Sequence, residues 1–225
     1  MTLPQTGRCV RKWLLTAICL VTSVAGLAAM NEEEPLTASK VFAEAPLEVL
    51  DMLRPSTRLD MLDYYNQADS LLTVTNALEG GSRLEQVASD YMRVAMTPVS
   101  TLEIKILRAG KRQIVMTLYT VGGDGMAKDT DVRFFDSTLK PIDGSRFLKA
   151  PDLTDFFSVG SHGIGKKELR EKIPFMAVCY STGPGDEPLK ATFTTLDVVS
   201  QEDRDILSPL LNQYLSAPWK GSYRF

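Results

Sequence analysis

The clearest hydrophobic pattern in the chain is a two-residue alternation between residues 90 and 121. The segments DYMRVAMT and TLEIKILR alternate apolar and polar side chains, which is typical of strands with one buried face. QIVMTLYTV is apolar on both faces and is expected to be a central strand. The residues expected to face a core are Met92, Val94, Met96, Leu102, Ile104 and Ile106, with Glu103 and Lys105 on the opposite face.

Short turns separate these strands, and further strands are predicted before and after them. LLTVTNAL predicts an earlier strand that ends in a turn at residues 80–82, and residues 98–100 predict another turn. The loop GGDGMAKDTD leads into a further strand, VRFFD. Because parallel pairing needs long crossover connections, four or five strands joined by short turns predict an antiparallel meander.

Helical spacing comes before the strands. APLEVLDML spaces its leucines as on one face of a short helix, which Pro55 would stop. STRLDMLDYYNQ predicts a second short helix with Ser56 as its cap. Its expected buried stripe is Leu59, Leu62 and Tyr65.

The second half is less regular. PDLTDFF supplies Leu153, Phe156 and Phe157 to the core, and KKELREK is a short charged helical turn. PFMAVCYS and LKATFTTLDV predict a second strand pair. QEDRDILSPLLNQYL predicts a helix that Ser200 caps and Pro209 kinks or divides. The ending WKGSYRF is expected to be a final strand, so residues 41–225 predict one α+β domain with helices at its start and near its end.

Residues 1–28 have the pattern of a secretory signal peptide. A basic start at Arg8, Arg11 and Lys12 precedes the apolar run WLLTAICLVTSV, small residues and the acidic NEEE. We therefore expect an exported protein, periplasmic or associated with the cell envelope, with a flexible leader over residues 29–40.

Two other interpretations of this segment compete with cleavage. The uncharged run after Lys12 is long enough for an uncleaved membrane anchor, which remains the alternative. A lipid-modified Cys19 is disfavoured, because Ile18 occupies the position where lipoprotein signals need a small residue. After cleavage we expect no transmembrane segment.

Composition narrows the classes of function. The chain has 225 residues, 44% apolar and 24% charged, as in ordinary folded proteins. Loss of the signal would leave 22 basic against 28 acidic residues, a net charge of −6, which disfavours nucleic-acid binding. It would also leave Cys179 as the one cysteine, which excludes an internal disulfide.

The segment GSHGIGKK, residues 160–167, resembles a phosphate-binding loop. Gly160, Gly165 and Lys166 have the required spacing, but Lys167 stands where Ser or Thr would ligate magnesium. The segment also lacks a buried strand before it and a long helix after it. We interpret it as a glycine loop and expect no nucleotide cofactor.

The sequence offers few residues for nucleophilic catalysis or for metal binding. His162 is the one histidine and would have to serve any Ser or Cys nucleophile, whereas Cys179 lies in an apolar strand, where a thiol is normally a buried hydrophobe. The loop acids Asp124, Asp129 and Asp131 could ligate calcium, but they depart from the EF-hand spacing. A solvated loop without metal is the expectation.

A pair of carboxylates is the remaining catalytic possibility. Glycoside hydrolysis needs two acids that can be far apart in sequence. Asp60, Asp63 and Asp90 lie near the aromatic residues Tyr64, Tyr65 and Tyr91, as in a sugar site. Asp60 and Asp63 also suit the solvated flank of an amphipathic helix, which is the interpretation we favour.

The motifs RLDMLDYYN, TLEIKIL and TVGGDGMAKDTDVRFFD give the chain a family resemblance. It resembles a group of uncharacterised exported proteins, largely from Bacteroidales, known as a domain of unknown function. The resemblance covers residues 41–225. It implies export and a single domain, and no activity, cofactor or catalytic residue.

The function expected from these patterns is that of a non-catalytic binding module. Its partner would be a protein, peptide or glycan of the cell envelope, with no catalytic residue, cofactor or metal. The alternative is a carboxylate-based hydrolase of glycans or cell-wall material. An open sheet edge can accept another strand, so the terminal segment is a candidate interaction edge through Trp219, Tyr223 and Phe225.

Overall fold

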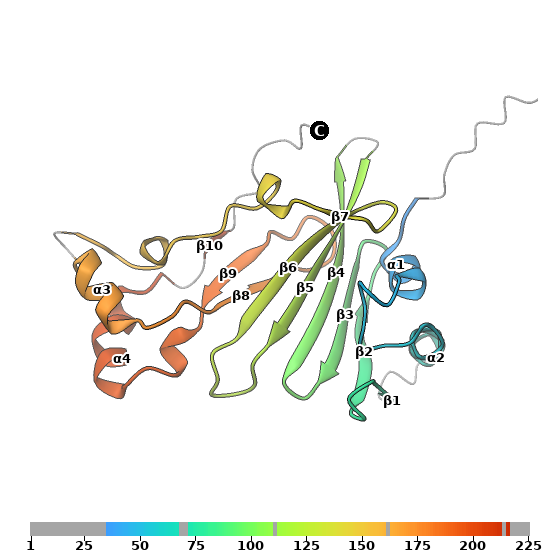
Figure 1. Ribbon diagram of the computed structural model, residues 1–225, viewed down its shortest axis with the longest axis horizontal. Helices are drawn as coiled ribbons and strands as arrows, with labels where there is room; N and C mark the ends of the chain where they lie inside the picture. Colours follow the sequence, from blue (N-terminus) through green and yellow to red (C-terminus); the bar gives the residue numbers. More distant parts are fainter. Residues whose placement is uncertain (1–34, 68–71, 110–111, 161–162, 213–214, 217–225) are drawn as a thin grey trace, which may run out of the picture. The chain divides into compact units, whose positions relative to one another are not determined.

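The described residues from Leu36 onward belong to one compact unit in the computed structural model. The structure describes residues 35–67, 72–109, 112–160, 163–212 and 215–216. Seven strands form the main sheet, in sequence order from one edge to the other, and neighbouring strands are antiparallel (Figure 1). The strands are β1 (Val74–Thr75), β2 (Gly81–Val87), β3 (Tyr91–Thr97), β4 (Ser100–Ala109), β5 (Arg112–Val121), β6 (Asp129–Asp136) and β7 (Pro141–Ile142).

A smaller sheet and short helices complete this unit. The smaller sheet has the order β10-β9-β8, formed by β8 (Val178–Ser181), β9 (Lys190–Phe193) and β10 (Leu215–Ser216). The α-helices are α1 (Ala38–Glu44), α2 (Pro55–Asn66), α3 (Lys166–Lys172) and α4 (Gln201–Leu207). Four 3-10 turns are η1 (Gly144–Arg146), η2 (Leu153–Asp155), η3 (Thr195–Asp197) and η4 (Ser208–Leu210). The expected α+β class with an antiparallel meander is confirmed.

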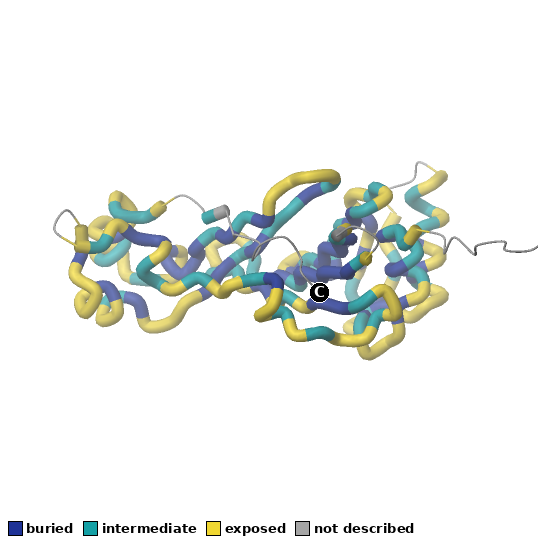
Figure 2. The backbone as a smooth tube through the Cα atoms, turned by 90° about the horizontal axis from the view of Figure 1, so that it is seen from above, coloured by how far each residue is buried: buried dark blue, intermediate teal, exposed yellow. Residues whose placement is uncertain are grey.

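Each face of the main sheet has its own apolar core. Helices α1 and α2 pack on one face, where Met92, Val94, Leu102 and Ile104 lie in the same cluster as Phe42. The smaller sheet and the segments after β7 pack on the other face. There the cluster contains Met116 and Leu118 of β5 with Phe134, Phe156, Phe193 and Leu207. In Figure 2 the buried residues follow the strands and the exposed ones follow the connections.

The alternation along β3 and β4 predicted these faces correctly. The six residues expected to face a core from β3 and β4 are all at most 3% exposed. β5 is the strand shared by the two cores, because Val115 belongs to the helix-covered cluster and Met116 to the other. It is therefore the central strand that its unbroken apolar run predicted.

The first helix lies earlier in the chain than expected. Residues 47–53 form turns and bends, and the helix is α1, over Ala38–Glu44, which begins within the segment assigned to a leader. The Thr37 hydroxyl accepts a hydrogen bond from the Lys40 amide and caps it. Pro46 disfavours helical backbone at Ala45, whose ψ is 135°, so the helix ends there. The folded unit thus begins before residue 41.

The second helix is confirmed, but its cap is not the one expected, and of its expected stripe only Leu62 and Tyr65 pack, partly buried, against the core. Pro55 is the first helical residue and Arg54 the cap, without a side-chain hydrogen bond. Arg58 and Met61 are the buried residues, whereas Leu59 is 53% exposed. The Arg58 guanidinium donates from Nη1 to the Phe42 carbonyl, 2.8 Å away, at the C-terminal end of α1. A cation at a helix C-terminus is electrostatically favourable, but Nε and Nη2 of this fully buried side chain have no hydrogen-bond partner among the described residues.

The region before β3 also departs from expectation. LLTVTNAL contributes the short strand β1, and residues 81–82 belong to β2 rather than to a turn. The turn is built by Asn76, whose Oδ1 accepts from the amides of Leu78 and Gly80. Its Nδ2 donates to Ser82 Oγ and to the Met96 carbonyl. This Asn-centred turn places β2 beside β3.

The second half follows the predicted elements more closely. α3 coincides with KKELREK, and β8 pairs antiparallel with β9. Phe156 and Phe157 are buried, and Leu153 is partly buried against the same core. Ser200 caps α4 by accepting from the Asp203 amide, and Pro209 lies in the 3-10 turn η4 that follows the helix.

Candidate functional site

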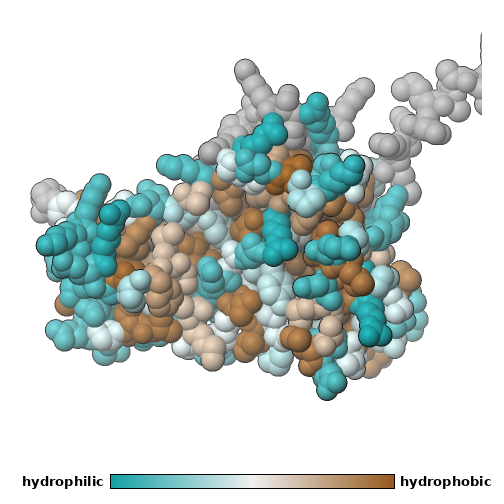
Figure 3. Space-filling model, viewed as in Figure 1, coloured by the Kyte–Doolittle hydropathy of each residue, from teal (hydrophilic) through white to brown (hydrophobic). Residues whose placement is uncertain are grey.

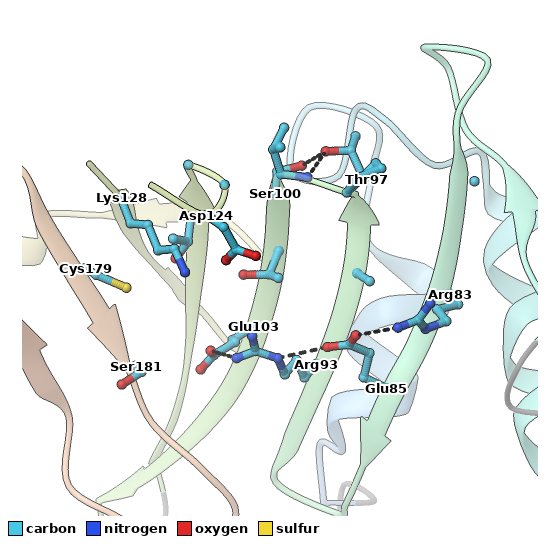
Figure 4. A pocket seen from close by; sticks show the side chains of 18 of the residues that line it. Arg83, Glu85, Arg93, Thr97, Ser100, Glu103, Asp124, Lys128, Cys179 and Ser181 are labelled. Carbon is cyan, nitrogen blue, oxygen red and sulfur yellow. Dashed lines mark hydrogen bonds and ion pairs between the residues drawn. The ribbon is translucent and has the colours of Figure 1, made fainter. Parts of the chain in front are cut away.

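A polar hollow lies on the face of the main sheet opposite α1 and α2. It encloses about 690 Å³. Side chains of β2, β3 and β4 form its floor, β8 forms one wall, and the β5–β6 loop forms another (Figure 4). The smaller sheet packs mainly against β5 and β6, so the part of this face over β2–β4 is left open.

A chain of ion pairs runs across the floor. Arg93 Nη1 lies 2.6 Å from Glu103 Oε1, and Arg93 Nε lies 3.0 Å from Glu85 Oε2. Arg83 extends the chain to Glu85 at 3.2 Å. Arg93 and Glu103 are direct partners in the β3–β4 register, so strand pairing itself sets this contact.

Glu103 is the deepest member of this chain. Its side chain is 3% exposed, and its second oxygen, Oε2, accepts from the Thr182 amide at 3.2 Å. Burial raises the pKa of Glu103, while the Thr182 amide and the Arg93 guanidinium oppose the rise. Both oxygens are therefore engaged within the fold.

A buried lysine fastens the turn between β8 and β9 to the main sheet. Lys105 Nζ lies 2.7 Å from Asp90 Oδ2, 2.8 Å from the Gly183 carbonyl and 2.6 Å from the Gly185 carbonyl. All three of its N–H donors have a partner. Burial alone would raise the pKa of Asp90, but hydrogen bonds from Lys105 and the Gly185 amide hold that pKa below its usual value. This clamp keeps Thr182 in place against Glu103.

The β5–β6 loop brings Asp124 and Lys128 to the rim of the hollow. Gly122 has a φ of +133°, and a Cβ there would lie 2.6 Å from the Ala127 carbonyl oxygen, so the closed loop requires glycine. Thr194 fixes the Lys128 backbone from the other side. Its Oγ1 accepts from the Lys128 amide at 3.0 Å and donates to the Lys128 carbonyl at 2.6 Å.

Strand β8 contributes Cys179 and Ser181 to the hollow. They alternate with Val178 and Tyr180, which belong to the core. Cys179 is half-buried within the predicted strand, but its side chain faces the hollow rather than the core. Burial raises the pKa of the Cys179 thiol, so the thiol is a weak nucleophile near neutral pH.

Several residues singled out in the sequence fall outside the described ranges. His162 is one of them, so its distance from Cys179 is not described. Trp219, Tyr223 and Phe225 are others, and their role as an interaction edge stays a prediction. Of the glycine loop, Gly160 has a φ of +114°, and α3, which follows Gly165, has only seven residues. That helix is too short for a phosphate-binding unit, as its sequence indicated.

The candidate acids are placed apart. Asp129 Oδ1 accepts from the Val178 amide, Asp131 pairs with Arg133, and Asp124 lies at the hollow. Asp60 and Asp63 are exposed on α2, whereas Asp90 bonds Lys105 on the opposite face of the sheet. No three His, Cys, Asp or Glu side chains within the described ranges are grouped as a metal site.

The residues that form the floor were present in the sequence pattern but were not recognised as a site. Glu103 and Lys105 were assigned to the polar face of their strand, yet both are under 5% exposed. A usable signal was the cross-strand match of charge, since Arg93 stands between the acids of β2 and β4. This match could not be recognised because residues 80–82 were predicted as a turn and no strand was predicted where β2 lies.

Comparison with known proteins gives a family and a fold. The model of a family described as "Protein of unknown function (DUF3256)" matches residues 33–225. A solved structure of a domain of an uncharacterised protein from Porphyromonas gingivalis W83 is similar with a TM-score of 0.66 and 15% sequence identity. The similarity covers 83% of this chain and 98% of that chain, and it shows a shared fold. No curated protein matches the chain. No helix among the described residues is long and apolar enough to cross a membrane.

Proposed function

We propose that this chain, which belongs to the DUF3256 family of proteins of unknown function, is an exported, non-catalytic module that binds a peptide segment of an envelope partner in its polar hollow. The export part of this proposal rests on the signal-like pattern of residues 1–28. The binding part rests on the hollow.

The observation that carries the proposal is the balance of charge in the hollow. Its lining includes three cations, Arg83, Arg93 and Lys128, and three acids, Glu85, Glu103 and Asp124. The four charges on the floor are already paired with one another. Hydroxyl groups of Thr101 and Ser181 also line the hollow and have no hydrogen bond to another described side chain. Such a lining suits a ligand rich in amides and hydroxyls.

A peptide fits this lining better than a sugar. A sugar ring packs well against the flat apolar face of an aromatic side chain. Tyr180 is the aromatic residue among the described lining, and it is 7% exposed because its ring belongs to the core. On the face shown in Figure 3, hydrophobic and hydrophilic side chains are interspersed. Without an exposed aromatic ring in its described lining, the hollow suits a peptide better than a sugar.

The proposal can be tested by blocking the floor. Ala95 lies on β3 and lines the hollow, so Ala95→Phe would fill it without introducing charge. A pool of capped heptapeptides should shift amide resonances of hollow residues in isotope-labelled protein, and Ala95→Phe should abolish those shifts. Ala150→Phe makes the same change at an exposed residue outside the hollow and should leave them unchanged. Peptide-induced shifts that survive Ala95→Phe would place binding elsewhere.

The carboxylate hydrolase is the second candidate. Glu103 is a buried acid of raised pKa in a hollow that also contains Glu85, and a general acid needs such a shift. Against it, Arg93 contacts both carboxylates and Thr182 occupies the second oxygen of Glu103. Release of soluble fragments from purified peptidoglycan, lost in Glu103→Gln and in Glu85→Gln, would establish the hydrolase instead. No release with intact peptide binding favours the binding module.

A further inference from the structure

We propose that the Lys128 end of the hollow binds a carboxylate of the ligand, so that the module selects acidic peptides. This inference rests on the proposed function, because it assigns one subsite within the peptide-binding hollow. It starts from Lys128, the one lining cation whose ammonium makes no hydrogen bond or ion pair within the described part of the chain.

The three cations of the hollow differ in what they already bind. Arg93 contacts two carboxylates and Arg83 contacts one. Among the residues that the structure describes, the Lys128 ammonium makes no hydrogen bond or ion pair, although the residue is partly buried at the hollow. An ammonium placed at such a rim has three donors available for a ligand.

Lys128 is also held in position before any ligand arrives. Thr194 bonds both its amide and its carbonyl, and Gly122 packs against its backbone. Figure 4 shows its side chain extending from the loop into the hollow, on the same side as Cys179 and Ser181. The anchored backbone fixes the point from which the side chain extends, so binding orders less of the chain than it would in a mobile loop.

The neighbouring groups favour a carboxylate over a more highly charged anion. Asp124, which belongs to the same loop, lines the hollow and has no hydrogen bond or ion pair to another described residue. A phosphate dianion would meet this acid and the floor acids with a single unpaired cation to balance it. A carboxylate carries one charge, which Lys128 can match, while Ser181 and Thr101 can donate to neighbouring carbonyl groups of a peptide.

The test compares peptides that differ in one group. The probes are acetyl-Gly-Glu-Gly-amide and its uncharged analogue acetyl-Gly-Gln-Gly-amide, titrated into the labelled full chain. The native protein should bind the Glu peptide roughly tenfold more tightly, the value of one charge-assisted contact. Lys128→Met should reduce this ratio to about one, because it removes the ammonium and retains the side-chain length. Lys128→Arg should restore the preference, and Lys149→Met, at an exposed residue outside the hollow, should keep it.

Two further probes identify the source of the carboxylate and the class of anion. Acetyl-Gly-Gly-Gly with a free C-terminus, compared with its amide, shows whether a terminal carboxylate serves as well as a side chain. Tighter binding of inorganic phosphate than of the Glu peptide would overturn the assignment to a carboxylate.

The remaining outcomes separate this inference from the proposed function. Peptides that shift hollow resonances with the same Glu-to-Gln ratio in Lys128→Met and in native protein would overturn the Lys128 subsite and leave the binding hollow in place. If none of these tripeptides nor the heptapeptide pool shifts hollow resonances, the peptide-binding function falls, and this inference with it. Unchanged β6 amide resonances in Lys128→Met would show that the fold is retained.

Discussion

At the scale of single residues, the buried charges of Glu103 and Lys105 each have an oppositely charged partner, whereas Nε and Nη2 of the buried Arg58 have no partner among the described residues. Glu103 is kept ionisable in a nearly closed site because Arg93 and the Thr182 amide each satisfy one oxygen. Removing one partner of such a pair costs more than the pair contributes, since the other charge is left buried. Arg93 therefore supports both the fold and the polarity of the hollow.

Arg93→Met should lower the free energy of unfolding at pH 7 by about 3 kcal/mol, because Glu103 would remain buried without its cation. Burial raises the folded pKa of Glu103 above its ordinary value of 4.5. The contribution of Glu103 to the free energy of unfolding is therefore fully present below pH 4.5 and is lost as the pH rises through the folded pKa. Without Arg93 this loss of stability is larger, because no guanidinium balances the ionised Glu103. The difference in free energy of unfolding between variant and native protein should therefore be small at pH 4 and large at pH 7.

Urea unfolding at both pH values measures this difference. Arg83→Met is the matched control, because the Arg83 side chain is 46% exposed and, among the described residues, forms an ion pair with Glu85 alone. It should change stability little at either pH. An equal loss for Arg93→Met at pH 4 and pH 7 would show that its packing, rather than its charge, stabilises the fold.

At the scale of elements, the two halves of the unit are joined by side chains as well as by apolar packing. Thr130 Oγ1 accepts from the Tyr180 amide, and Lys105 binds the carbonyls of the β8–β9 turn. These contacts align β8 along the wall of the hollow. The position of Cys179 and Ser181 therefore depends on residues of the main sheet.

Lys105→Met should release the β8–β9 turn and lower the free energy of unfolding by about 3 kcal/mol, because Asp90 and two carbonyls lose a buried donor. The folded pKa of Asp90 lies below its ordinary value of 3.8, so its contribution is present above pH 3.8 and is lost as the pH falls through the folded pKa. The deficit of the variant should accordingly shrink in acid. Hydrogen exchange should show the amides of Thr182 and Gly185 losing protection at pH 7.

Lys172→Met provides the comparison for this clamp. Lys172 also pairs with an aspartate, Asp203, at 2.8 Å, but its side chain is 23% exposed against 5% for Lys105. Its loss should change global stability little. If both variants lost the same stability, burial of Lys105 would not be the source of the effect.

The elements differ in how far their sequence could predict them, and the reasons are physical. Strands β3 and β4 were predictable because every second residue faces the helix-covered core, and β5 because its unbroken apolar run requires a core on both faces. The start of the unit was not, because α1 depends on a cap at Thr37 and on Pro46 rather than on leucine spacing. The site was predicted least, since its members come together through the register of β2–β4 and a turn more than 75 residues away along the chain.

At the scale of the whole unit, the main sheet is the layer common to both cores. β5 sends alternate side chains into each of them, and β6 does the same through Phe134 and Phe135. Neither core can be formed without these strands. The smaller sheet, the helices and the main sheet should therefore unfold together rather than as separate layers.

Phe156→Ala tests this cooperativity. Phe156 is fully buried in the core beneath the smaller sheet and packs against Phe193, with ring centroids 5.5 Å apart. Its truncation should lower the free energy of unfolding by about 4 kcal/mol. Ile104 and Val94 face the other core, whereas Met116 faces the core of Phe156. Because the two cores share strands, the free energy of exchange at the Ile104 and Val94 amides should fall by the same amount as at the Met116 amide. Protection lost at Met116 but retained at Ile104 would instead show that the smaller sheet and its core open independently of the helix-covered face.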